Sequence, residues 1–168
     1  EQMNVLMWNA KEKFFFDYNY HTKRHSLFLS VAGFYPLWAG LATPEQAAAV
    51  REFTLPIFEY DGGITNTQPT GLSVDRKQHD YPNGWPQQQW IVIRGLLNYG
   101  FWQDAERIAK KWLDMNVKIF EETGKFWERH DVITCSIAGV DTDRYLLQSG
   151  FGWTNAVFVR LVSEFGWK

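Results

Sequence analysis

The sequence predicts a mainly α-helical protein assembled from antiparallel helix hairpins, either as a bundle or as a toroid. Several segments place apolar residues at helical spacing, whereas runs of strict apolar and polar alternation are few. Stretches rich in Gly, Asn, Asp and Pro separate these segments and favour loops. Consecutive helices without intervening strands pack as hairpins, which gives this fold class.

The first hairpin is predicted from residues 26–42 and 43–58. The segment 26–42 is apolar on nearly every side, so a helix there should lie between other helices, and Pro36 should kink it. The second segment carries a helix start signal. Thr43 suits the N-cap and Gln46 follows it by three residues, as in a capping box. We therefore expect two consecutive helices joined by a turn.

A long loop is predicted over residues 61–84, which lack any periodicity. Loops of this length in a compact domain are usually functional or disordered. The pair Asn83-Gly84 is expected to form a turn just before a helix over residues 86–100. That helix has a wide apolar stripe and places three glutamines in its first turn.

The remaining elements continue the same pattern. Residues 101–124 form an amphipathic pattern that ends at Gly124, a typical C-cap. Residues 125–136 are expected to be extended, and a final helix is expected over 153–166. The polar loops at 61–84, 125–131 and 139–153 each precede a more apolar helix, so we expect them to converge on one rim.

The composition indicates one globular domain with no sign of a nucleic-acid or membrane partner. A chain of 168 residues can bury one core. A net charge of −2 and an isoelectric point near 6.1 provide no basic surface for nucleic acid or anionic lipid. No apolar run reaches the roughly 18 residues of a membrane span. We expect a soluble protein.

The cysteine content and the first residue bear on the compartment and on completeness. A single cysteine, Cys135, cannot form an internal disulfide, so an oxidising compartment is not required. The compartment stays open, with a slight preference for the cytoplasm. The chain begins with Glu1 and not with Met, which indicates a processed chain or a fragment.

Aromatic residues are unusually frequent, at 17% of the chain with nine Trp. Most of these rings should fill the core, but flat rings also stack on the apolar faces of sugars. A phosphate-binding glycine loop after a strand is not found. His21 and His25 lie four residues apart in an aromatic, extended-looking segment with basic neighbours, so a metal site there is not expected.

Carboxylates in aromatic loops are the better candidates for chemistry. They are Asp80, Glu128, Asp131, Asp141 and Asp143. Glycoside hydrolysis uses a carboxylic acid to protonate the leaving oxygen and a second carboxylate as base or nucleophile. Glu128 suits the base, because it follows two aromatic residues and its basic neighbours favour the ionised form. Taken alone, its Glu-Arg-His-Asp string would more often be a solvated ion-pair surface.

Two long strings resemble the trehalase family of inverting glycoside hydrolases. Residues 78–85, reading QHDYPNGW, are similar to a family string that runs into Pro-Asn-Gly-Trp, and residues 148–155, reading QSGFGWTN, match another. Residues 34–47, 61–64 and 128–132 also match in order and approximate spacing. The resemblance covers nearly the whole chain.

The resemblance implies an all-α fold that is part of an (α/α)6 toroid, built from antiparallel helix hairpins with long functional loops. Residues 1–168 would be the C-terminal part of a single catalytic domain. The family hydrolyses α,α-trehalose to two glucose molecules with inversion, without a metal or other cofactor, and Glu128 occupies the place of its general base. Rings and amides suit a neutral sugar, because amides donate and accept as hydroxyls do. The expected substrate-binding residues are Gln78, Asp80, Asn83, Trp85, Gln89, Asp143, Gln148, Phe151 and Trp153.

Three residues depart from the family pattern. His79 stands where the family has Trp, and His130 stands where it has Tyr. Arg144 takes the place of a sugar-contacting Glu, for which the neighbouring Asp143 could substitute. These changes bear on the preferred disaccharide more than on the fold.

The general acid of the family, an Asp in a Gly-Trp-Asp string, has no counterpart in these 168 residues. An inverting site needs both carboxyl groups, about 6.5 to 9.5 Å apart. We therefore expect the acid upstream of this chain, the upstream half of the same enzyme as partner, and little activity from the isolated chain. Two alternatives stay open: a toroidal glycosidase for another glucoside, and a non-catalytic sugar-binding module.

Overall fold

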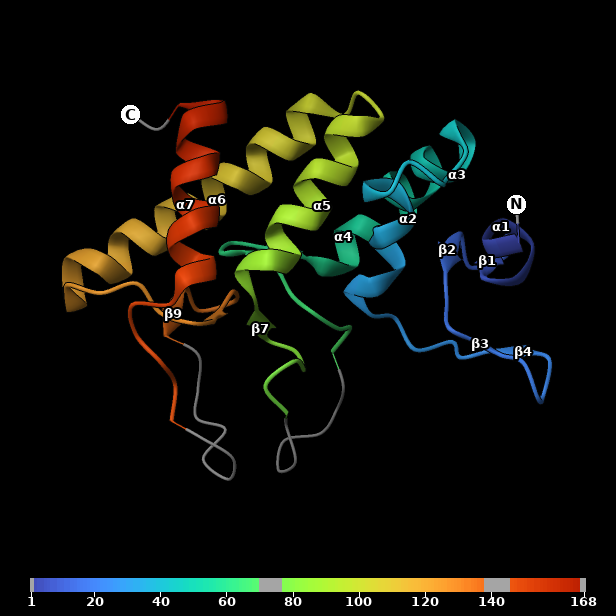
Figure 1. Cartoon of the computed structure of the whole chain (residues 1–168), viewed down its shortest axis with the longest axis horizontal. Helices are drawn as coiled ribbons and strands as arrows, with labels where there is room; N and C mark the ends of the chain where they lie inside the picture. The colour runs from blue at the N-terminus through green and yellow to red at the C-terminus, as the bar shows by residue number, and fades with distance from the viewer. Residues whose placement is uncertain (1, 70–76, 138–145, 167–168) are drawn as a thin grey trace.

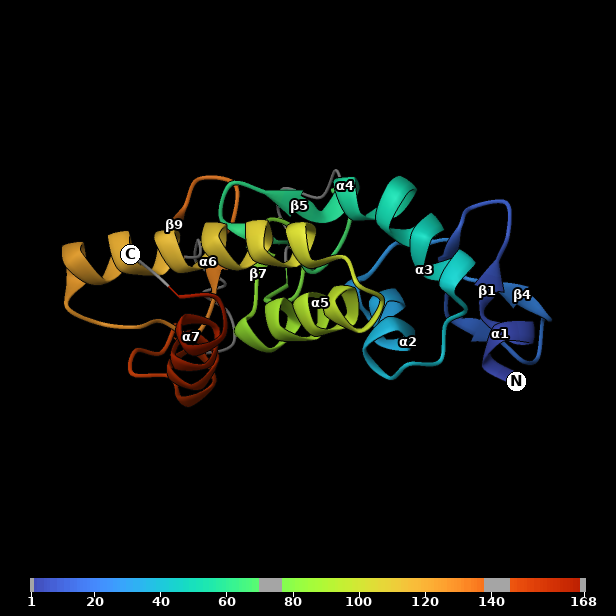
Figure 2. The ribbon, with the colours of Figure 1, turned by 90° about the horizontal axis from the view of Figure 1, so that it is seen from above.

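Helices packed in two layers make up most of the structure, as predicted. The computed structural model describes residues 2–69, 77–137 and 146–166. The three longest helices are α5 (Pro86–Asn98), α6 (Trp102–Thr123) and α7 (Gly152–Phe165), which pack against one another. Seen from above, α3, α4 and α6 form one layer, and α2, α5 and α7 form the other (Figure 2).

The helix predicted from Thr43 begins where expected. It consists of α3 (Pro44–Ala49), a π-helical turn (Val50–Thr54) and α4 (Leu55–Phe58). Both hydrogen bonds of the capping box are present. The Gln46 N–H donates to Thr43 Oγ1 at 3.2 Å, and the Thr43 N–H donates to Gln46 Oε1 at 2.8 Å.

The continuous helix predicted over residues 26–42 is wrong. The segment is irregular up to a 3₁₀ helix (Val31–Phe34), which leads into the single turn α2 (Tyr35–Trp38). Pro36 lies in the first turn of α2, where its missing N–H costs nothing, so it starts a helix and does not kink one. The segment is also not enclosed, since Leu27 is 60% exposed. The apolar composition of residues 26–42 predicted a longer helix than the one that forms over residues 31–38.

The residues before this segment form short hairpins. Helix α1 (Gln2–Leu6) precedes the antiparallel pair β1 (Trp8–Asn9) and β2 (Phe14–Phe15). A second pair, β3 (Tyr18–Asn19) and β4 (Arg24–His25), follows, which agrees with the extended reading of the His21 and His25 segment. The close-packed Phe14 ring leaves room only for a glycine at Gly33.

Two small sheets interrupt the long polar segments. Strands β5 (Glu59–Tyr60) and β6 (Gly63–Ile64) form an antiparallel pair. Strands β7 (Asn83–Gly84), β8 (His130–Asp131) and β9 (Ser136–Ile137) form an antiparallel sheet in that order. The turn predicted at Asn83-Gly84 is therefore wrong, because this pair hydrogen-bonds to β8 as a strand. A Cβ at Gly84 would lie 2.5 Å from Val132 Cγ1, so only glycine fits this close approach.

The three C-terminal helices lie where the sequence predicts them. Helix α6 ends at Gly124, whose left-handed φ of 68° makes the expected C-cap. The polar segment 125–136 is extended only in part, since a turn separates β8 from β9. Within the described ranges, no helix has both the length and the apolar character needed to cross a lipid bilayer.

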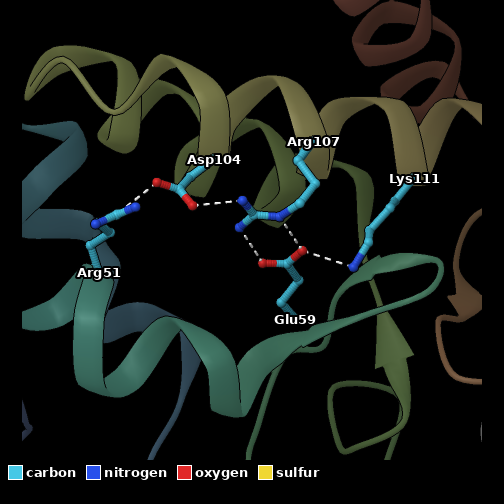
Figure 3. A network of polar contacts seen from close by, with 5 residues as sticks. All are labelled: Arg51, Glu59, Asp104, Arg107 and Lys111. Atoms are coloured by element: carbon cyan, nitrogen blue, oxygen red, sulfur yellow. Dashed lines mark hydrogen bonds and ion pairs between the residues drawn. The ribbon is translucent and has the colours of Figure 1, made fainter.

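A chain of ion pairs joins α6 to the π-helical turn before α4 and to the start of β5 after it (Figure 3). Asp104 of α6 bonds Arg51 at 2.6 Å and Arg107 at 2.7 Å. Arg107 in turn donates two hydrogen bonds to Glu59, which also accepts one from Lys111 at 2.8 Å. Burial works to raise the pKa of Glu59, but the two cations outweigh it and lower the pKa. Glu59 is thus held as a carboxylate at the start of β5.

Candidate active site

Three segments far apart in the sequence meet at one end of α5 and α7 (Figure 1). Strand β7, directly before α5, pairs with β8. The Glu128 N–H donates to the Gln148 carbonyl at 3.0 Å, and the Gly150 N–H donates to the Phe126 carbonyl at 2.7 Å. The described parts of the three polar loops therefore converge as the sequence predicted.

Trp85 is the centre of this cluster. It is the N-cap residue of α5 and only 5% exposed. Its backbone N–H donates to Asn66 Oδ1 at 3.3 Å, and its indole Nε1–H donates to the Gln78 carbonyl at 2.8 Å. The ring contacts Phe151 and Trp153 edge-on, with centroids 6.1 and 6.4 Å away. Trp85 therefore organises the cluster but offers little open surface of its own.

Glu128 is connected to this cluster by the neighbouring residue Arg129. The Glu128 side chain pairs with the Arg129 guanidinium, and both residues are at most 3% exposed. The guanidinium lies over the Trp85 ring, 5.7 Å from its centroid. A solvated ion-pair surface, the other interpretation of this string, is therefore wrong. The Glu128 carboxylate is thus buried and is linked to the indole rings through the Arg129 guanidinium.

The loop before Trp85 uses its polar groups to hold itself in shape. Asp80 accepts a hydrogen bond from the Lys77 N–H at 2.8 Å and closes its own turn. The Gln78 carbonyl is the acceptor for Trp85 Nε1. Asn83 is buried in β7, and its carbonyl accepts from the Asn66 N–H at 2.9 Å. The sequence-predicted contacts Gln78, Asp80 and Asn83 thus lie at the site, with these groups committed to the loop.

Gln89 does not fit the expected role of a sugar contact. Its side chain is fully buried, and Oε1 accepts from the Ile64 N–H at 2.8 Å while Nε2–H donates to the Ile64 carbonyl at 2.6 Å. Both ends of the amide are therefore occupied by backbone. The Gln89 amide pairs with the backbone of β6 in the way that a neighbouring strand would, and so holds β6 against the start of α5.

The C-terminal string supplies the exposed part of the cluster. Phe151 is the N-cap residue of α7, and its ring lies 5.6 Å from that of Trp153. Trp153 is 53% exposed, so its ring is open to a ligand. Gln148 is exposed next to them and its carbonyl holds the Glu128 N–H. Asp143, and with it Arg144, lies outside the described residues.

Two histidines at the site were not predicted as functional residues. His79 stacks on Trp85, with ring centroids 4.6 Å apart and an interplanar angle of 12°. His130 in β8 is fully buried, and neither ring nitrogen has a hydrogen-bond partner within the described part of the chain. Burial lowers the pKa of His130 to about 3, so it is a neutral core residue at neutral pH. In the sequence, the one feature that marks them is that His79 stands where the trehalase family has Trp and His130 stands where it has Tyr.

Metal-ligating groups do not gather at the candidate site. Among residues 2–69, 77–137 and 146–166, no three His, Cys, Asp or Glu side chains are arranged to hold a metal ion. His25, one of the pair considered in the sequence, bonds the Leu6 carbonyl at 2.8 Å. His21 instead lies against Tyr20, with ring centroids 3.9 Å apart.

Comparisons with known sequences give a consistent family. The family model for trehalase matches residues 1–166. The cytosolic neutral trehalase of Beauveria bassiana is 38% identical over 172 residues, and that of Saccharomyces cerevisiae is 35% identical over 178. These alignments cover 94% and 95% of this chain but 23% of each relative. The chain therefore spans about a quarter of their length.

Comparisons with solved structures agree on the architecture. The neutral trehalase of Saccharomyces cerevisiae superposes with a TM-score of 0.83 at 34% identity, covering 96% of this chain and 28% of that one. A mannosylglycerate hydrolase from Thermus thermophilus in complex with glucose gives 0.70 at 23% identity, covering 92% and 36%. The second likeness concerns the fold alone.

Proposed function

Because the chain belongs to the trehalase family and is a portion of an (α/α)6 toroid, we propose that it forms the C-terminal part of a catalytic domain that hydrolyses α,α-trehalose. The products would be two glucose molecules, formed with inversion. The observation that carries this proposal is the buried Glu128 carboxylate beside the ring cluster of Trp85 and Trp153.

In this proposal Glu128 is the general base. Its carboxylate takes a proton from the attacking water while that water adds to the anomeric carbon. Arg129 supports this role by position, because its guanidinium pairs with the Glu128 carboxylate and lies over the Trp85 ring. The anomeric C–O bond breaks, and a second carboxyl group protonates the leaving glucose oxygen.

The general acid and the rest of the sugar site would come from the upstream part of the same enzyme, in the same chain or in a separate one. Two observations support this partner. The chain covers 23% of the length of its curated relatives. Several large apolar side chains are also exposed, including Leu146 at 84% and Val159 at 68%. Since those relatives are named cytosolic neutral trehalases, we propose the cytosol as the compartment.

The test uses the complete trehalase domain that contains these residues and measures glucose release from trehalose. The variant Glu128→Gln keeps the size of the side chain and removes the base, so kcat should fall by about 10²- to 10⁴-fold. The control is Glu121→Gln, which changes an exposed glutamate of α6 and should leave kcat unchanged.

Two results would count against the proposal. Near-normal glucose release by Glu128→Gln removes the base role from this residue. A complete domain that binds disaccharides in isothermal titration but never releases glucose indicates a binding module in place of an enzyme.

A further inference from the structure

The residue that the candidate site leaves unexplained is His79. Its imidazole lies almost flat on the Trp85 indole, with 4.6 Å between centroids, and yet the residue is exposed. A stacked histidine with an open side can offer a ring nitrogen to a ligand. Which nitrogen it offers, and whether that nitrogen donates or accepts, follows from its neighbours.

The neighbours of Asn66 fix the orientation of its amide. The Trp85 backbone N–H can only donate, so the atom that faces it at 3.3 Å must be the Asn66 oxygen. The Asn66 NH₂ group therefore points the other way, toward His79 Nδ1 at 2.9 Å. Because Asn66 is only 2% exposed, its amide cannot turn toward solvent and exchange these partners for water.

The tautomer of His79 follows directly. An NH₂ group donates, so Nδ1 must be the unprotonated acceptor. The ring proton of neutral His79 is then on Nε2. Among the described residues, none forms a hydrogen bond with Nε2. His79 thus presents one N–H donor beside the buried Trp85 ring, which in turn contacts the exposed Trp153 ring.

The charges around His79 keep it in this form. Partial burial and the Arg129 guanidinium lower the pKa of His79, and Asp80 works against them. The ring is therefore neutral at neutral pH. Protonation at Nδ1 would set an N–H against the Asn66 NH₂ group and break the arrangement.

We propose that His79 is a sugar-contacting residue whose Nε2–H donates a hydrogen bond to a hydroxyl oxygen of the bound disaccharide. The inference rests on the proposed function and adds a contact that determines substrate fit. A neutral hydroxyl suits this donor, because neither partner carries a charge that must be desolvated without compensation. Asn66 acts through His79 and Trp85 and is a positioning residue.

The test compares two ring variants in the complete trehalase domain. His79→Phe keeps a flat ring and has no donor, whereas His79→Trp keeps a flat ring with one N–H. Both lose the acceptor for Asn66, and only His79→Trp has an N–H, so the comparison between them tests the donor. We expect His79→Phe to raise KM for trehalose by about 3- to 10-fold, and His79→Trp to stay closer to the wild type.

A pH series supplies a second readout that a purely structural role would not give. In the wild type, KM should rise as the pH falls through the lowered pKa of His79, which lies below the ordinary histidine value of about 6.5, because protonation disrupts the contact with Asn66. His79→Trp should lack this rise. This comparison also holds if His79→Phe does not fold.

The two kinds of failure are distinguishable. Equal KM values for the wild type and both variants, or the same pH dependence in the wild type and His79→Trp, overturn the role of His79. A wild-type domain that does not hydrolyse trehalose overturns the proposed function instead.

Discussion

Buried amide side chains near the site form hydrogen bonds with backbone groups that have no backbone partner among the residues that the structure describes. Gln89 bonds both the N–H and the carbonyl of Ile64, and Asn66 bonds the N–H of Trp85. Removing such a side chain would leave buried backbone groups unpaired, at about 1–3 kcal/mol each. The position of the ring cluster therefore depends on two residues that need not touch a ligand.

The buried His130 leads to the first prediction, which concerns how the free energy of unfolding changes as the pH falls. Its pKa is ordinarily 6.5 and is lowered to about 3 by burial. Below pH 6.5 the unfolded chain binds a proton that the folded chain excludes, so this residue costs stability as the pH falls. The loss should approach about 1.4 kcal/mol per pH unit until the folded pKa is reached. Urea unfolding of the complete domain between about pH 4 and 7 measures it.

The variant His130→Phe removes the titrating group and keeps an aromatic ring in the core. Its unfolding free energy should fall less steeply with acid than that of the wild type. His21→Gln is the matched control, because His21 is exposed and its replacement should leave the slope unchanged. An unchanged slope in His130→Phe would show that other groups cause the acid sensitivity.

At the residue scale, the sequence predicted position better than role. The loops that carry Trp85 and Glu128 meet as expected, through the pairing of β7 with β8, because long strings around both residues carried the signal. The use of the Gln89 amide could not be predicted, since the same donor and acceptor pair suits a sugar hydroxyl and a peptide group. His79 was seen only as a substitution, because its tautomer depends on Asn66, thirteen residues earlier in the chain.

At the scale of elements, explicit end signals proved more informative than apolar content. The capping box at Thr43 and the C-cap at Gly124 each mark an observed helix end. The segment 26–42 had no such end signals, and the helix predicted there contracted to short turns. The pair Asn83-Gly84 became a strand because β8, from a distant part of the sequence, pairs with it. Local patterns contain no information on such pairing.

Gly124 gives a prediction at this scale. Its φ of 68° is unfavourable for a side chain, although a Cβ there would meet nothing within 4 Å. Gly124→Ala should therefore cost about 1–2 kcal/mol through backbone strain alone. Gly152→Ala is the matched control, because that site is equally open and has no left-handed φ, so the change should stay within about 0.5 kcal/mol. Thermal melts of both variants make the comparison, and equal losses would contradict it.

At the scale of the whole molecule, the exposed apolar side chains are the notable feature. Helix α7 lies at one end of the molecule and the N-terminal hairpins at the other (Figure 1). Val159 on α7 is 68% exposed, and Val5 of α1 is 78% exposed. We expect another part of the complete domain to cover these side chains.

Val159 provides the corresponding test in the complete domain. If the upstream part packs on α7, Val159→Asp buries a charge and should lower the unfolding free energy by about 2 kcal/mol or more. Thr22→Asp, at an exposed turn, should change it by no more than about 0.5 kcal/mol. Chemical unfolding of the two variants compares them. Equal stability would mean that Val159 stays in water.

The overall architecture followed from the order of helices and loops together with the family strings. The two-layer stacking in Figure 2 is what helix hairpins produce when they repeat around a ring. The ion pairs that join α6 to the π-helical turn and to β5 were not foreseen, because Arg51 and Glu59 are separated from their α6 partners by more than forty residues. Charged residues on helices give no indication of which distant partner they will meet.

The sheet of β7, β8 and β9 also determines where this protein can vary in size. It ties the start of α5 to the segment after α6 by direct backbone bonds. The turn at Gly100, between the two helices, lies at the opposite end of α5 (Figure 1). Extra helical turns inserted there would lengthen the hairpin outward and leave the distance between Trp85 and Glu128 as it is. We therefore expect changes in chain length at that turn to leave the backbone bonds between β7 and β8 intact.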